Sequence, residues 1–219
     1  MACVAVVAVI GALPLRAQAS ATAAREGNLA TRTGDPVGAH TTGSDPLRTL
    51  QRSEETLQTS LRRRAPDWSP EADVVRQRVS AILVGLLDYE AIARHALGPD
   101  WEQLTGTQRR AFLQRFSALT NRAFTGALAR SDVRLRFDSE TVFGPVASVI
   151  VTALGPGSVE KTFDYRMALN GGRWLVYDVF ADRDSLVEDY RVEFGRFLRQ
   201  GSFDELIARM DRKLGDAAP

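Results

Sequence analysis

The chain has 219 residues, of which 44% are hydrophobic, and its 28 basic and 27 acidic residues leave a formal net charge of +1. A chain of this length can bury one good-sized core, so one folded domain is expected. Because charges of both signs are interspersed, no long-range positive field is available to attract DNA or RNA, and a nucleic-acid-binding role gains little support.

The chain begins with an apolar segment at residues 2–15, about as long as the hydrophobic region of a secretory signal peptide. Ala17 and Ala19 then supply small residues where a signal peptidase reads. A membrane anchor is the competing interpretation, but about 14 residues are fewer than the roughly 20 that span a bilayer. We therefore predict a signal peptide at 1–19 and export. The sole cysteine, Cys3, lies inside it, so the mature chain would form no disulfide.

Residues 20–44 are rich in Ala, Thr, Gly and single charges without apolar periodicity, which predicts a disordered linker before a domain at 45–219. Helical periodicity then resumes. Four helices are expected, at about 45–64, 70–86, 88–97 and 105–130. Their ends carry local signals, which are Ser69 before Pro70, Gly98 as a left-handed cap, and Thr105 with Gln108 as a capping box.

After Ser131 the apolar period changes from 3.6 to 2, which predicts strands at about 133–137, 146–154, 159–169 and 173–180. Gly155-Pro156-Gly157 and Asn170-Gly171 are the expected turns, the second a two-residue hairpin of type I′. That hairpin would pair Met167 with Trp174, Tyr165 with Val176, and Phe163 with Asp178.

Two helices complete the chain, one from the N-cap Ser185, with Glu188 as capping-box partner, to Gln200, and one after Gly201. The order of elements predicts an α+β fold in which about six helices pack on a curved, four-stranded antiparallel sheet. The strands would present a strongly apolar and aromatic wall. Such a wall fits an ordinary core as well as a ligand pocket.

Few residues could carry catalysis, because the only histidines are His40 in the linker and His95 near a helix end. The sequence has no zinc-ligand spacing, no Gly-x-Ser-x-Gly elbow and no phosphate-binding glycine loop. We expect no metal site and no catalytic set. Asp178 would lie on the apolar wall, where an unpaired charge is costly, so we predict a structural ion pair with Arg191. A general base of a cone-shaped enzyme is the alternative.

Several short sequence motifs resemble those of the MlaC family of periplasmic phospholipid carriers, and they follow in the order expected for that family. They cover roughly residues 75–214, and the chain departs from the family pattern in the charged turn at 181–184. The matching residues and motifs are Asp88-Tyr89, Ala96-Leu97-Gly98, Trp101, Gln108, Phe112, Phe116, Asp164-Tyr165-Arg166, Trp174, Val176-Tyr177-Asp178-Val179, Ser185-Leu186-Val187, Tyr190-Arg191 and Phe194.

The resemblance implies a periplasmic carrier that exchanges phospholipid with an inner-membrane ABC transporter complex and an outer-membrane lipoprotein complex, and so maintains outer-membrane lipid asymmetry. No cofactor is implied beyond the phospholipid cargo. The alternatives are a carrier of hopanoid-type lipids, an adaptor that binds only proteins, and a cone-fold enzyme that uses Asp178 and His95.

A carrier must hide nearly all of both acyl chains, since exposing about 30 methylenes costs on the order of 24 kcal/mol. We therefore predict a cavity of about 1,000 Å³ between sheet and helices. Its expected lining is Leu83, Leu86, Phe112, Phe116, Phe163, Tyr165, Met167, Trp174, Val176, Tyr190 and Phe194.

Overall fold

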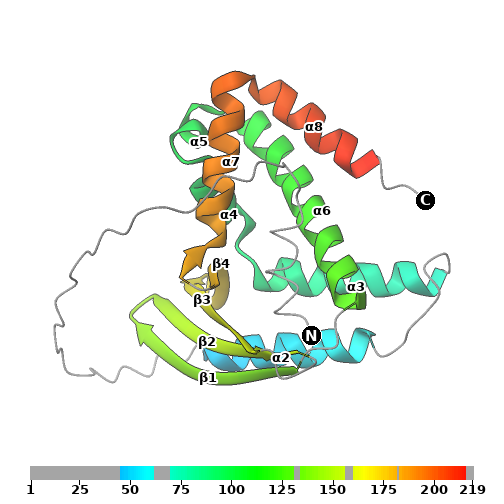
Figure 1. The fold of residues 1–219 in the computed structure, drawn as a ribbon, viewed down its shortest axis with the longest axis vertical. Helices are drawn as coiled ribbons and strands as arrows, with labels where there is room; N and C mark the ends of the chain where they lie inside the picture. The colour runs from blue at the N-terminus through cyan, green and yellow to red at the C-terminus, as the bar shows by residue number, and fades with distance from the viewer. Residues whose placement is uncertain (1–44, 62–69, 131–133, 156–159, 182, 216–219) are drawn as a thin grey trace.

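The computed structural model describes residues 45–61, 70–130, 134–155, 160–181 and 183–215 (Figure 1). The predicted signal peptide, the linker, the Ser69 cap and most of the turn at 155–157 lie outside these ranges. Within the described part, no helix is long and apolar enough to cross a membrane.

Within the described residues, five helices precede the sheet. They are α2 (Pro46–Leu61), α3 (Pro70–Leu86), α4 (Tyr89–Leu97), α5 (Pro99–Gln103) and α6 (Gly106–Arg130). The predicted cap at Thr105 is present, because its hydroxyl accepts the backbone N–H of Gln108 at 3.3 Å. Gly98 ends α4 with a positive φ of +55°, but its ψ of −130° differs from the left-handed helical conformation that was predicted. Only α5 was not predicted, since five residues are too few to show a helical period.

The strands are β1 (Arg134–Phe143), β2 (Val146–Leu154), β3 (Glu160–Asn170), β4 (Arg173–Ala181) and the short β5 (Asp184–Ser185). All pairs are antiparallel, and each strand pairs with its neighbour in sequence. The antiparallel meander is confirmed, with one strand more than expected. β1 is longer than predicted because a bulge near Asp138 interrupts its alternation but not its pairing with β2.

The β3–β4 hairpin turns one residue later than predicted. Gly171 and Gly172 occupy the turn with φ of +56° and +76°, and Asn170 pairs with Arg173. A type I′ turn needs positive φ at both central residues, and two glycines adopt it without a Cβ clash.

The predicted register of this hairpin is therefore wrong by two residues. The observed pairs are Leu169 with Trp174, Met167 with Val176, Tyr165 with Val179, and Phe163 with Ala181. Between Val176 and Asp178 the register shifts, which leaves Tyr177 as the extra residue of a bulge and reverses the alternation beyond it. Val179 and Ala181 are buried as a result, whereas Asp178 is half-buried and pairs with Arg166.

Helices α7 (Leu186–Gln200) and α8 (Phe203–Gly215) complete the described chain. As predicted, the Ser185 hydroxyl accepts the backbone N–H of Glu188 at 3.0 Å. Ser202 and Glu205 form a reciprocal capping box at the start of α8, with distances of 2.7 and 3.2 Å. The chain runs from β4 through the short β5 directly into α7 and so enters a helical layer (Figure 1).

Buried apolar side chains form two clusters. In Figure 1 the sheet and α2 lie below α3, and α5, α7 and α8 lie above it. The sheet core joins the inner face of the sheet to α2 and α3. It contains Leu50, Leu57, Val79, Leu83, Leu86, Leu87, Ala147, Val149, Val151, Ala153, Phe163, Tyr165, Met167, Trp174, Val176, Val179, Ala181 and Leu186. The helix core joins α4, α5, α6, α7 and α8. It contains Ala93, Ala96, Leu97, Trp101, Phe112, Phe116, Val187, Tyr190, Phe194, Leu206 and Met210.

Candidate functional site

The side chains predicted to line one lipid cavity are all buried, with at most 7% of each exposed. They nevertheless divide between the two cores. The sheet core holds Leu83, Leu86, Phe163, Tyr165, Met167, Trp174 and Val176, and the helix core holds Phe112, Phe116, Tyr190 and Phe194. They do not surround one common space in this structure.

Aromatic rings hold the helix core together between α6 and α7. Phe116 meets Tyr190 edge to face at 5.5 Å, and Tyr190 stacks on Phe194 at 5.5 Å with an interplanar angle of 11°. Phe112 stacks on Phe116 at 5.5 Å and meets Phe194 edge to face at 5.6 Å. Such ring pairs stabilise beyond their buried area, so the four side chains pack as one unit.

A small space of about 20 Å³ lies where the two cores meet. We call this boundary the seam. Its lining comes from α4, α6 and α7, from β4, and from the short segment between α3 and α4. The residues that line it are Leu87, Ile92, Phe116, Thr120, Val176, Asp178, Val179, Leu186, Val187 and Tyr190.

Sequence reasoning found only Phe116, Val176 and Tyr190 among the apolar seam residues. Val179 was missed because the bulge at Tyr177 reverses the strand alternation that would have revealed it. Leu87 was missed because it follows the last helical turn of α3, where it forms a parallel bridge with Val176. Thr120 lies one turn after Phe116, and this i, i+4 spacing is the signal that could have found it.

A second space of about 40 Å³ lies between α6, α7 and α8. Its walls are mainly apolar, and three half-buried charged residues, Glu193, Arg209 and Lys213, also contribute. Burial raises the pKa of Glu193 and lowers that of Lys213, and the opposite charge of each partner opposes both shifts. Neither space approaches the predicted volume of about 1,000 Å³, so these two spaces do not provide the expected open cavity.

Asp178 connects β4 to the start of α7. One carboxylate oxygen accepts the backbone N–H groups of Val179 at 2.7 Å and Val187 at 3.2 Å, and the other accepts the Ser185 hydroxyl at 2.6 Å. Burial raises the pKa of Asp178, and these hydrogen bonds and the charge of His95 oppose the rise. The carboxylate therefore acts as a cap for α7, where backbone N–H groups and the helix dipole favour an anion.

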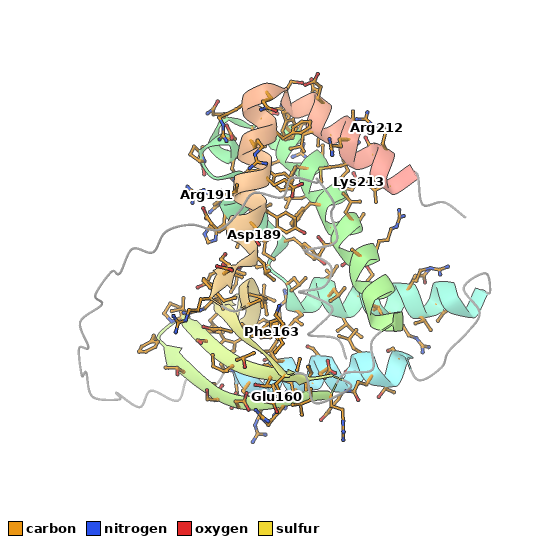
Figure 2. All side chains as sticks on the ribbon, in the orientation of Figure 1. Glu160, Phe163, Asp189, Arg191, Arg212 and Lys213 are labelled. Carbon is orange, nitrogen blue, oxygen red and sulfur yellow. The ribbon has the colours of Figure 1, made fainter. Side chains whose placement is uncertain are left out.

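The predicted ion pair between Asp178 and Arg191 is wrong. Arg191 lies on the outer side of α7 (Figure 2), with 51% of its side chain exposed, and its guanidinium meets Glu188 at 3.4 Å. The inward face of α7 is formed by Leu186, Val187, Tyr190 and Phe194. Arg191 directly follows Tyr190, so its side chain points away from this face. Asp178 instead meets donors in β4, at the N-cap of α7 and in the first turn of α7.

The cone-fold enzyme alternative required Asp178 and His95 to serve a substrate. The ring of His95 packs edge to face on Tyr177 at 6.0 Å, while three donors occupy the Asp178 carboxylate. A capping role accounts for this arrangement. Over the described ranges, no three His, Cys, Asp or Glu side chains gather as metal ligands would.

The comparisons with known proteins agree on one family. The model of the family described as MlaC protein matches residues 51–212. A relative from Haemophilus influenzae, named intermembrane phospholipid transport system binding protein MlaC, is 22% identical over 175 residues, which cover 77% of this chain and 82% of the relative.

A solved structure has the same fold. The phospholipid-binding protein from Ralstonia solanacearum, solved in complex with a phospholipid, superposes with a TM-score of 0.66 at 21% identity, over 79% of this chain and 98% of that one. The family model covers most of the described domain, including every element from α3 to α7. On this evidence the chain belongs to the MlaC family.

Proposed function

We propose that the protein is a periplasmic phospholipid carrier. The acyl chains of the bound lipid would enter at the seam between the sheet core and the helix core. The observation that carries the proposal is the lining of the seam, where apolar side chains of both cores face one small space. The relative from Haemophilus influenzae and the structure from Ralstonia solanacearum support it by what their names state.

In this proposal the structure, with its small seam, corresponds to a closed form. Two acyl chains need far more than about 20 Å³, so loading requires the two cores to separate. Separation exposes apolar surface, at about 25 cal/mol for each Å². The incoming chains cover the same surface, so the lipid itself compensates for the opening.

The proposal extends to the setting of the protein. A signal peptide at 1–19 would export it to the periplasm, where it would shuttle lipid between an inner-membrane ABC transporter complex and an outer-membrane lipoprotein complex. This exchange would maintain outer-membrane lipid asymmetry. The word intermembrane in the relative's name supports this setting.

The test is mass spectrometry of lipids extracted from the purified protein, combined with transfer of labelled phospholipid between vesicles. Val176→Asp places a charge in the seam at a residue that is 1% exposed, whereas Val142→Asp places the same charge on the β1–β2 hairpin at a residue that is 46% exposed. We expect the seam variant to lose bound lipid and the hairpin variant to keep it. Circular dichroism establishes that both remain folded.

Two results would contradict the proposal. A folded Val176→Asp protein that keeps its full lipid load would remove the seam as the binding site. Wild-type protein that neither retains nor transfers lipid would favour the adaptor alternative. Extracted hopanoids in place of glycerophospholipids would keep the carrier and change its cargo.

A further inference from the structure

The hydroxyl of Tyr190 is a buried polar group without a hydrogen-bond partner among the described residues. Tyr190 is 2% exposed and lines the seam. Buried side-chain hydroxyls nearly always have a partner, and leaving one without a partner costs about as much as its lost hydration. The exception therefore needs a physical explanation.

The hydroxyl cannot move to find a partner, because the ring is held on two sides. Phe116 contacts it edge to face with an interplanar angle of 77°, and Phe194 stacks on it. Rotation of a tyrosine ring about its own axis leaves the hydroxyl oxygen in place. Tyr190 also lines the seam space, so a molecule that enters the seam can bring a partner to the oxygen.

The chemistry of the seam determines which partner fits. Burial raises the pKa of Tyr190 well above its usual range, and the charge of Glu193 adds to the rise, so the hydroxyl stays a neutral donor. None of the ten described residues that line the seam space is cationic, and one of them, Asp178, is a carboxylate. An anionic phosphate or an ionised carboxylate would meet repulsion there, whereas a neutral carbonyl oxygen would not.

We propose that Tyr190 donates a hydrogen bond to an ester carbonyl oxygen of the lipid, so that the seam distinguishes acyl-linked from ether-linked chains. The inference rests on the proposed function and names the atom that the site recognises. An ether oxygen is a weaker and less accessible acceptor, so an ether lipid would leave the hydroxyl unpaired in the loaded form also. A site built around a hydrogen bond rejects the analogue that lacks it.

The experiment compares the affinities of diacyl and dialkyl phosphatidylethanolamine of equal chain length for the full-length protein. Wild-type protein should prefer the diacyl lipid by about 5- to 10-fold, the worth of one buried neutral hydrogen bond. Tyr190→Phe should bring this ratio close to one. Tyr177→Phe, a tyrosine outside the seam lining, serves as the matched control and should keep the wild-type ratio.

If Tyr190→Phe fails to fold, a second measurement on the wild-type protein tests the hydrogen bond to the ester carbonyl. The carbonyl stretch of isotope-labelled diacyl lipid bound to wild-type protein should move to lower frequency than in an apolar solvent. An unshifted band would overturn the inference.

Other outcomes also decide between explanations. If Tyr190→Phe keeps the wild-type lipid ratio, the hydroxyl does not meet the lipid carbonyl, and the inference fails. If wild-type protein binds both lipids equally, the inference fails while the carrier function stands. If it binds neither lipid, the proposed function fails as well.

Discussion

The sheet core and the helix core are held together by different forces. The sheet core has its strands joined by the continuous backbone ladders of β1 to β4, and α2 is attached to it where the backbone N–H of Leu47 reaches Glu140 at 3.1 Å. The helix core has no ladder between its elements. Five of its 11 buried residues are aromatic, compared with three of 18 in the sheet core.

Side-chain contacts therefore fix the helices of the helix core relative to one another. Arg115 on α6 forms a bidentate pair with Asp211 on α8 at 2.7 and 2.9 Å, and Arg122 donates to the backbone carbonyls of Lys213 and Leu214 at 3.1 Å. Such contacts break and re-form one at a time, unlike a strand ladder. The comparison indicates that, if the seam opens as proposed, the helix core is the part that shifts.

The largest expected effect comes from emptying one core at a time. Phe112 and Phe163 are both 0% exposed, and replacing either by alanine should lower the free energy of unfolding by about 3–5 kcal/mol. Denaturant unfolding measures the loss. Amide hydrogen exchange should show that Phe112→Ala loosens α6, α7 and α8 while β2 and β3 keep their protection. Equal loss of protection in both cores would show that they open as one unit.

The next effect concerns the connection between the cores. Asp178→Ala leaves three donors without their acceptor, so we expect a loss of roughly 3 kcal/mol. Arg191→Ala removes only an exposed pair with Glu188 and should cost less than about 1 kcal/mol. Thermal denaturation of the two variants gives the comparison. If the two variants lost equal stability, the result would favour the predicted ion pair between Asp178 and Arg191 over the hydrogen bonds seen in the structure.

A smaller effect is expected from pH. Burial raises the pKa of Glu140, Asp178, Asp189 and Glu193, so the folded state binds more protons than the unfolded state just above their ordinary pKa values. Stability contributed by such groups is present at low pH and is lost as pH rises through the folded pKa values. Asp138, whose pKa is lowered by its bonds to Thr152 and Arg136, has the opposite sign.

The melting temperature should therefore rise by roughly a few degrees as the pH is lowered from 7 to 5, since four carboxyl groups with raised pKa values outweigh one with a lowered pKa. Differential scanning calorimetry across this range provides the measurement. Asp178→Asn should flatten the profile because it removes one of the raised groups. A melting temperature that falls steadily from pH 7 to pH 5 would contradict the sign.

The smallest effect is expected from removing residues 1–44. Their sequence lacks a face that could be buried, so a chain that begins at Asp45 should melt within a few degrees of the full chain. Loss of cooperative unfolding would show that this segment belongs to one of the two cores.

Features that depend on neighbouring residues were predictable from the sequence. Thr105 with Gln108 and Ser202 at the start of α8 mark helix ends because a cap involves residues within one turn of each other. Strand alternation likewise predicted both ends of β2 correctly. Helical spacing predicted the inward faces of α6 and α7. Within the part of the chain that the structure describes, these local rules identified every helix of more than five residues.

Features that depend on distant residues were not predictable. Asn170, Gly171 and Gly172 allow two hairpin turns, and only pairing along the whole of β3 selects the later one. The bulge at Tyr177 has no sequence signal of its own, yet it moves Asp178 off the apolar wall. The division of the expected cavity residues into two cores arises because a periodic face shows that a residue is buried, but not which other faces bury it.

The sequential strand order has a consequence for the order of folding. Each strand pairs with the next along the chain, so the sheet can grow through short loops, whereas Arg115 and Asp211 in the helix core are 96 residues apart. Contacts between distant residues form late because they pay a larger loop-closure entropy. We expect the helix core to close last during folding and to reopen first. The opening that loads a lipid would then retrace the final step of folding.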